Sequence, residues 1–137
     1  MITMRELNKF NSTDNSDHES NLLVLLGKIN QVRKAYGKPM TVTSGYRTKE
    51  DHLRIYRQIA TRKGIKFDPS KVPMASRHLS GQAVDIYDPK GEFKQWIKMN
   101  IELFEELGLY LEDFNHTPTW VHIQTVAPRS GKRFFIP

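Results

Sequence analysis

The sequence contains no cysteine in its 137 residues. This absence excludes a disulfide framework, a thiolate metal site and a cysteine nucleophile, so any metal ion must be bound by histidine, aspartate or glutamate. Long apolar runs are also absent: the longest, Leu22 to Leu26, is far shorter than the roughly 20 residues of a membrane-spanning helix. The first residues lack the basic start, apolar stretch and cleavage site of a secretory signal. We therefore expect no membrane span, and a chain that is cytoplasmic when made.

Positive charge exceeds negative charge in this chain. Lysine and arginine number 21 against 15 aspartate and glutamate residues, which gives a net charge of +6 at pH 7. An excess of this size favours an anionic partner, and both nucleic acid and the anionic bacterial cell wall fit that description. The basic residues are scattered, with short clusters at 54–57 and 62–63 and no arginine-rich arm, so a solvated basic surface explains them equally well.

The length and composition fit one compact domain over residues 1–137, with a polar segment at 1–19 and a tail at 127–137. The first expected helix would have Ser20 as its N-cap and would stop at Gly37. Apolar residues at helical spacing predict three helices in all, at about 20–36, 48–64 and 91–107.

Two segments alternate between apolar and polar residues with a period of two, which is typical of strands with one buried and one free face. In each segment two β-branched residues flank one polar residue, Asp85 at 83–87 and His122 at 119–125. Pairing these strands would bring Asp85 and His122 together. A further strand is expected at 40–44, and an irregular loop at 64–77.

His78 is the third candidate ligand, because it lies shortly before Asp85 and Gly81 lets the chain turn back toward the same place. Two histidines and one carboxylate fill three positions of a tetrahedral zinc site and leave the fourth for water, the arrangement of a catalytic zinc. Each residue alone also has an ordinary explanation: histidines are usually hydrogen-bonded surface or core residues, and a strand aspartate can pair with an arginine. The combination is what favours a metal site.

Three motifs occur in order along the chain: Ser-Gly-Tyr-Arg at 44–47, Ser-x-His-x-x-Gly-x-Ala-x-Asp at 76–85 and Trp-x-His at 120–122. With these motifs the chain resembles, over roughly residues 20–125, the zinc D-alanyl-D-alanine carboxypeptidases and L-alanyl-D-glutamate endopeptidases of bacteria and their phages. The resemblance implies a hedgehog/DD-peptidase-like α+β fold, in which a small antiparallel sheet has helices packed on one face. It also implies one zinc ion (Zn2+) bound by His78, Asp85 and His122.

The same resemblance places Arg47 in the substrate pocket and gives Ser76 a part in substrate binding. Tyr46 and Trp120 are the neighbouring aromatic candidates for substrate contact. A guanidinium can hold a peptide carboxylate or stabilise the oxyanion that forms when water attacks an amide, so Arg47 is also a candidate catalytic residue. The ordinary alternative for Arg47 is a surface salt bridge after a turn.

The chain departs from the family pattern at Thr119. Many members carry a glutamate three residues before the last zinc histidine as general base, and a threonine hydroxyl is a poor base. His116 is the first candidate to replace that glutamate, because it lies in the same segment and titrates near neutral pH. Asp113 and Glu112 are the nearby carboxylates that could serve instead.

These observations predict a zinc metallopeptidase that hydrolyses an amide bond of peptidoglycan stem peptides by zinc-activated water. The carboxypeptidase and endopeptidase reactions both fit, as do a phage lysis or virion enzyme and a cytoplasmic bacterial peptidase. The missing glutamate supports one alternative, a non-catalytic zinc-containing module that binds cell-wall peptides. A nucleic-acid-binding domain with stacking aromatic residues is weaker, since Trp96 falls in the predicted core and Trp120 beside the metal site; we expect no nucleic acid partner.

Overall fold

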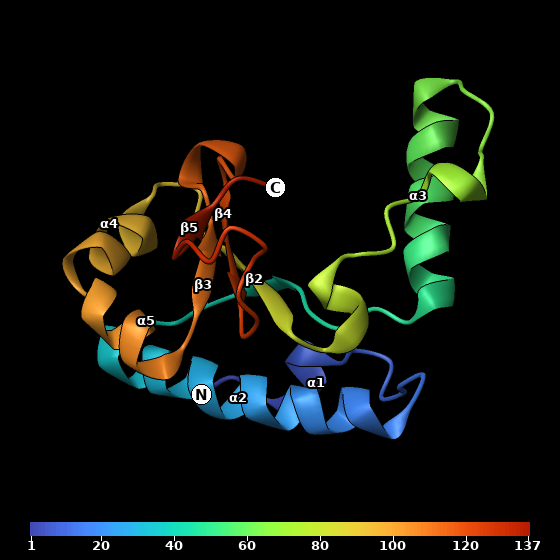
Figure 1. Ribbon diagram of the computed structural model, residues 1–137. Helices are drawn as coiled ribbons and strands as arrows, with labels where there is room; N and C mark the ends of the chain where they lie inside the picture. The colour runs from blue at the N-terminus through green and yellow to red at the C-terminus, as the bar shows by residue number, and fades with distance from the viewer.

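A five-stranded sheet forms the centre of the computed structural model, which describes residues 1–137 (Figure 1). The strand order is β1-β2-β4-β3-β5, and the first four strands pair antiparallel with their neighbours. The strands are β1 (Val42–Ser44), β2 (Ala83–Tyr87), β3 (Tyr110–Glu112), β4 (Trp120–Gln124) and β5 (Phe134–Phe135). The expected α+β class is confirmed, with one difference: β5, which comes from the tail, pairs parallel with β3 and makes the sheet mixed.

Five helices and three short 3-10 turns surround the sheet. The helices are α1 (Met4–Leu7), α2 (Ser16–Tyr36), α3 (Lys49–Lys63), α4 (Glu92–Met99) and α5 (Ile101–Leu107). The 3-10 turns are η1 (Pro69–Lys71), η2 (Arg77–Ser80) and η3 (Phe114–His116). None of the helices combines the length and the apolar character needed to cross a membrane.

The core lies between the apolar face of the sheet and the helices α2, α4 and α5. Alternate residues of β2 and β4 supply the sheet's part, and all are almost fully buried: Val84, Ile86, Val121 and Ile123. The helices supply Leu25, Ile29, Val32, Phe93, Ile97 and Phe104. Because strand side chains alternate between faces, packing these residues inward leaves the polar residues between them on the opposite, open face.

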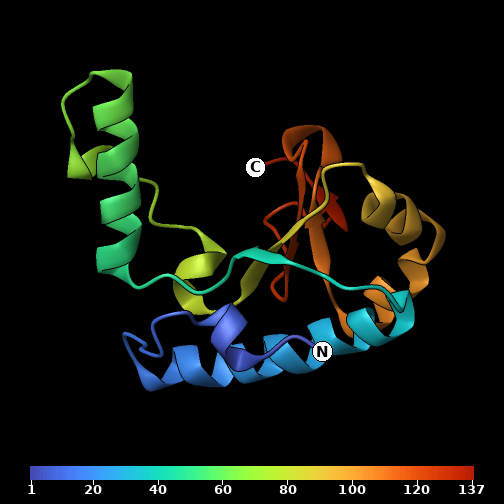
Figure 2. The same cartoon turned by 180° about the vertical axis from the view of Figure 1, so that it is seen from behind.

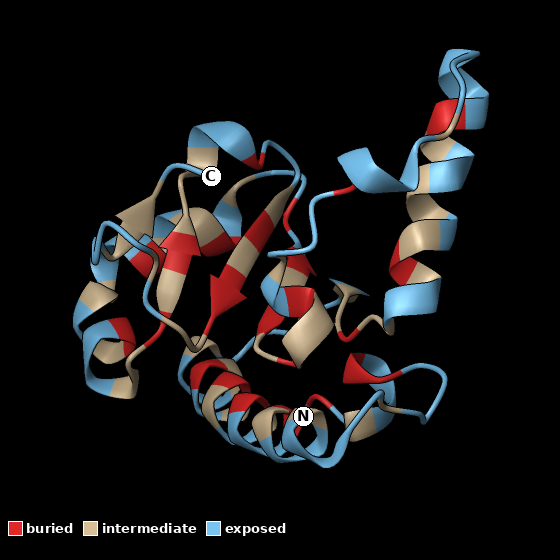
Figure 3. Cartoon of the chain, turned by 45° about the vertical axis from the view of Figure 1, so that its right-hand side comes forward, coloured by how far each residue is buried: buried red, intermediate tan, exposed pale blue.

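Helix α3 stands apart from the rest of the domain in both views (Figures 1 and 2). Figure 3 shows that most of its surface is exposed or intermediate, and only His52 and Ala60 are buried in it. Thr48 is its N-cap and Gly64 its left-handed C-cap, which agrees with the helix expected at about 48–64. The following segment, expected as an irregular loop at 64–77, contains η1 and leads into η2.

Two helix boundaries were predicted wrongly. The first long helix begins at Ser16, because the Asn15 side chain caps it by accepting the His18 backbone N–H at 3.0 Å; Ser20 lies inside the helix. The helix expected at 91–107 is two helices, since the chain breaks at Asn100, where the side-chain amide donates to the Trp96 carbonyl at 2.8 Å. Such local side-chain bonds compete with the helical ladder.

The segment expected to be a polar start, residues 1–19, is folded onto the domain. Ile2 and Leu7 are buried in the core. The side chain of Asn30 in α2 forms a two-bond clamp on the Ile2 backbone, accepting from its N–H at 2.8 Å and donating to its carbonyl at 2.9 Å. Buried apolar residues and hydrogen bonds from distant residues thus hold a segment whose composition is mainly polar.

We predict that Gly45→Ala lowers the free energy of unfolding by about 1–3 kcal/mol. A Cβ at Gly45 would lie 2.2 Å from the carbonyl oxygen of Leu7, which accepts the Tyr46 N–H at 2.6 Å, so α1 would have to move off the sheet edge. Urea denaturation measures the change. Gly27→Ala is the matched control: Gly27 is in α2 with nothing within 4 Å, and this substitution should stabilise by about 0.5–1 kcal/mol. Equal effects of the two substitutions would contradict the account.

Candidate metal centre

The open face of the sheet carries the three residues expected to bind metal. Antiparallel pairing of β2 with β4 places Asp85 directly opposite His122, as the alternation of the two segments predicts. His78 comes from η2, which immediately precedes β2, and Gly81 ends that turn in the left-handed conformation (φ 75°). The three side chains are largely shielded, with relative exposures of 6% for His78, 14% for Asp85 and 12% for His122.

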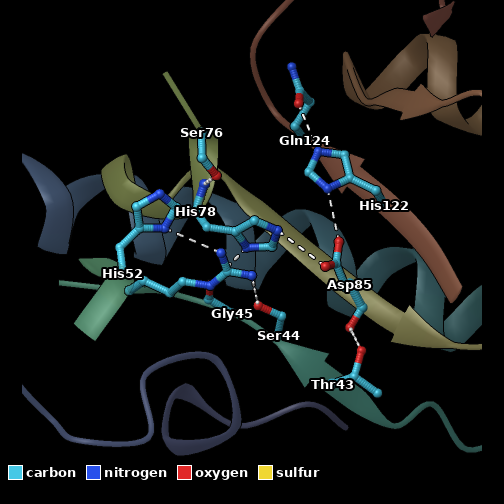
Figure 4. A network of polar contacts seen from close by, with 10 residues as sticks. Thr43, Ser44, Gly45, His52, Ser76, His78, Asp85, His122 and Gln124 are labelled. Atoms are coloured by element: carbon cyan, nitrogen blue, oxygen red, sulfur yellow. Dashed lines mark hydrogen bonds and ion pairs between the residues drawn. The ribbon is translucent and has the colours of Figure 1, made fainter. Parts of the chain in front are cut away.

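The two imidazoles approach the Asp85 carboxylate from two sides (Figure 4). His122 Nδ1 lies 2.8 Å from Oδ1 of Asp85, and His78 Nε2 lies 3.3 Å from Oδ2. One ligand atom from each residue lies within 4.8 Å of the other two. Two imidazole nitrogens and a carboxylate oxygen suit a divalent transition metal such as zinc, so the donor set fits a metal ion.

Each imidazole is held by a second hydrogen bond on its other nitrogen. His78 Nδ1 donates to the Gly45 carbonyl at 2.8 Å, which leaves Nε2 free to face Asp85. The Gln124 amide nitrogen donates to Val126 O at 2.8 Å, so its oxygen faces His122 and accepts from Nε2, also at 2.8 Å. Such partners fix ring orientation in metal sites, and both rings here turn their other nitrogen toward the Asp85 carboxylate.

The charge of the centre calls for a cation. Burial by itself would raise the pKa of Asp85, but the hydrogen bonds from His122 and His78 outweigh it and hold the pKa well below its usual value. Burial would likewise lower the pKa of His122, and its bonds to Asp85 and Gln124 raise the pKa instead. A buried anion between two imidazoles therefore needs either a proton or a metal ion beside it.

Arg47 is held next to this cluster by contacts on both of its terminal nitrogens. Nη2 donates to Ser44 Oγ at 2.9 Å, and Nη1 lies 3.3 Å from His52 Nδ1. His52 Nε2 donates to the Pro73 carbonyl at 2.8 Å, so Nδ1 is the acceptor for Arg47. Burial, as the largest cause, lowers the pKa of His52 and keeps the ring neutral for this role. The Arg47 N–H also donates to the His78 carbonyl at 3.1 Å.

The other residues expected to bind substrate have defined places. Ser76 is the N-cap of η2, and its Oγ accepts the His78 N–H at 3.3 Å. Trp120 is half-buried on β4, two residues before His122 and therefore on the same face. Tyr46 is buried, and its hydroxyl is hydrogen-bonded to His18 Nδ1 at 2.8 Å. Ser76 and Trp120 thus border the centre, and Tyr46 ties the motif to α2.

The two residues expected to move protons, His116 and Asp113, bond to each other. His116 Nδ1 and Asp113 Oδ2 lie 2.9 Å apart, with Asp113 at the start of the turn η3 and His116 at its end. The side chains are 46% exposed for His116 and 32% exposed for Asp113. Neither belongs to the cluster of candidate metal ligands.

Sequence reasoning missed Gln124 and His52, and named Glu112 only as one of the nearby carboxylates. Gln124 could have been found, because it lies two residues after His122 on a strand with clear alternation. The place of Glu112 beside His122 could be found only from the register of β3 against β4. His52 lies five residues after Arg47 in the first turn of α3, and neither the apolar periodicity nor the three motifs single it out.

Comparison with known families agrees with this geometry. A family model described as VanY, D-alanyl-D-alanine carboxypeptidase, matches residues 16–131, which include all three candidate ligands. No curated protein sequence matches the chain. The family match covers most of the chain, from the start of α2 past the end of β4, and the chain therefore belongs to the VanY family of D-alanyl-D-alanine carboxypeptidases.

Proposed function

We propose that this chain is a zinc-dependent peptidase that hydrolyses an amide bond in the stem peptides of bacterial peptidoglycan. The observation that carries the proposal is the centre itself: His78, Asp85 and His122 bring three possible ligand atoms within 4.8 Å of one another. Membership of a peptidase family supports the reaction class. The net charge of +6 supports a substrate that bears carboxylates.

One zinc ion would be held by His78 Nε2, a carboxylate oxygen of Asp85 and His122 Nδ1. When bound, it would supply the Lewis acidity that polarises the scissile carbonyl and activates water. The protein's own part is to hold the two imidazole rings in a fixed orientation, and the bonds to Gly45 and Gln124 support this role.

Arg47 is the proposed anchor for the substrate. Because Ser44 and His52 hold its terminal nitrogens, the guanidinium keeps one orientation beside His78. A fixed cation at this place can bind a peptide carboxylate, or stabilise the negative charge that develops on the carbonyl oxygen during hydrolysis. Ser76 and Trp120 border the same centre. We assign Ser76 a contact with the polar backbone of the peptide and Trp120 a contact with an apolar part of it. Tyr46 supports the Arg47 segment through its bond to His18.

A second candidate function is a zinc-containing module that binds cell-wall peptides without cutting them. Thr119 favours it, because the side chain three residues before His122 cannot act as a base of ordinary strength. The same ligand set would bind zinc in either case, so metal content alone does not distinguish the two functions.

Metal content and hydrolysis measured together test the proposal. The wild-type protein should bind about one zinc ion per chain and release soluble peptides from purified peptidoglycan. His122→Ala should lose both the metal and the cleavage, since it removes one of three ligands. Stoichiometric zinc without cleavage of any wall peptide would favour the binding module, and absence of zinc from every preparation would refute both functions.

Gln124→Met should weaken zinc binding about 10- to 100-fold. The substitution keeps the size of the side chain but removes the oxygen that accepts the His122 Nε2–H, so the ring loses its fixed orientation. Competition with a chelator of known zinc affinity measures the loss. His116→Asn is the control, because His116 is a histidine outside the ligand cluster. Unchanged affinity in Gln124→Met would show that the orientation of His122 does not depend on this bond.

Arg47→Ala should reduce kcat/KM about 100- to 1000-fold while the zinc stoichiometry stays the same. The expected loss follows from removing a positioned cation that the substrate or its developing oxyanion contacts. Peptide release under kcat/KM conditions gives the ratio, and Arg62→Ala, at an exposed position in α3, is the matched control. Cleavage by Arg47→Ala at the wild-type rate would show that Arg47 has no part in substrate binding or catalysis.

A further inference from the structure

Glu112 lies on the open face of the sheet, directly beside the candidate metal centre. Leu111 pairs with Ile123 in the antiparallel ladder of β3 and β4, so the next pair along the ladder is Glu112 and His122. Leu111 and Ile123 point into the core, and their neighbours point to the opposite face. A row of side chains therefore crosses the sheet in the order Asp85, His122, Glu112.

The carboxylate of Glu112 has no role in holding the fold together. It makes no hydrogen bond or ion pair with any protein group, although the residue is half-buried. Partly buried carboxylates are normally paired, because desolvation disfavours their charged form. Here burial is the main cause that raises the pKa of Glu112, and the nearby His122 works against it. Glu112 is also not one of the clustered candidate ligands, so it stands next to the centre rather than in it.

The other acidic groups near the sheet are already engaged. Asp85 is a candidate ligand, and it and Glu112 are the two carboxylates that the strands contain. Asp88, just after β2, is buried and accepts the N–H groups of Phe93 and Lys94 at the start of α4. Asp113 bonds to His116 on an exposed turn. Glu112 is left as the unpaired carboxylate that shares the face with the ligands.

We propose that Glu112 is the catalytic general base of this site, an inference that rests on the proposed peptidase function. Hydrolysis of an amide needs a group that accepts a proton from the attacking water and returns it to the leaving nitrogen. The water oxygen bonds to the amide carbon as one water proton passes to an Oε of Glu112. The carbon–nitrogen bond then breaks and Glu112 gives that proton to the nitrogen. The products are a carboxylic acid and an amine, and Glu112 returns to its starting state.

The test compares Glu112→Gln with wild type in four measurements. The amide of glutamine keeps the shape of the side chain but cannot accept the proton, so hydrolysis should fall about 100- to 10,000-fold. Zinc stoichiometry should stay the same, as should the visible spectrum of the cobalt(II)-substituted protein, which reports the ligand set. The dissociation constant for a synthetic stem pentapeptide ending in D-Ala-D-Ala should change less than about threefold, a ΔΔG well under 1 kcal/mol.

Three further variants make the result specific. Glu112→Asp keeps a carboxylate base on a side chain one methylene shorter, and it should restore part of the hydrolysis that Glu112→Gln loses. Glu105→Gln removes an exposed carboxylate of α5 and should behave as wild type. His116→Asn should keep most of the activity, since the inference assigns the proton to Glu112.

Several outcomes would overturn the inference. Cleavage by Glu112→Gln at the wild-type rate would exclude Glu112 as the base. A loss of cleavage confined to His116→Asn would instead assign the base to the His116–Asp113 pair. A changed cobalt spectrum or lost metal in Glu112→Gln would make Glu112 a ligand. Failure of the proposed peptidase function is distinguishable from these outcomes, because the wild-type protein itself would then release no peptide. That result would also refute the role of Glu112 as a base.

Discussion

The antiparallel pairing of β2 with β4 holds Asp85 opposite His122, and the whole centre depends on that register. A slip of one residue would turn both side chains into the core and bring Val84 or Ile86 to the open face. The register is kept by burial of Val84, Ile86, Val121 and Ile123, each with at most 1% of its surface exposed. Packing on one face of the sheet thus fixes the chemistry on the other.

The chain brings further groups to this pair through short connections. The 3-10 turn before β2 contributes His78, and the segment between β1 and α3 contributes Arg47, whose backbone N–H donates to the His78 carbonyl. The Gly45 carbonyl accepts a hydrogen bond from the His78 ring, so the first motif orients the candidate ligand of the second. The three motifs are far apart in the sequence and form one hydrogen-bonded unit around a buried anion.

The sequence predicted those parts of the structure in which a local pattern decides the outcome. Alternation around Asp85 and His122 predicted both strands and their buried faces, and glycine positions predicted where the helices end at Gly37 and Gly64. The prediction of Ser20 as an N-cap was wrong because Asn15 is an equally good cap that lies earlier in the chain. The role of His52 depends on the geometry of the turn into α3 and on a bond to the distant Pro73 carbonyl, which apolar periodicity does not specify.

The choice of a proton acceptor shows the same limit. Proximity in sequence to His122 favoured His116, whereas the ladder of β3 and β4 brings Glu112 to the adjacent position on the sheet. Cross-strand neighbours lie closer than residues a few positions apart in a turn, and the pairing of a three-residue strand such as β3 is not readable from composition. For this reason the cluster of candidate ligands could be predicted from motifs, and the position of Glu112 beside it could not.

The measurement that tests the central claim most directly is anomalous X-ray scattering at the zinc edge from crystals of the zinc-loaded protein. The account predicts one strong peak per chain, within bonding distance of His78, Asp85 and His122 at once, about 2.0–2.2 Å from the ligand atoms. A peak at the His116–Asp113 pair, or no peak in crystals grown with zinc, would contradict it.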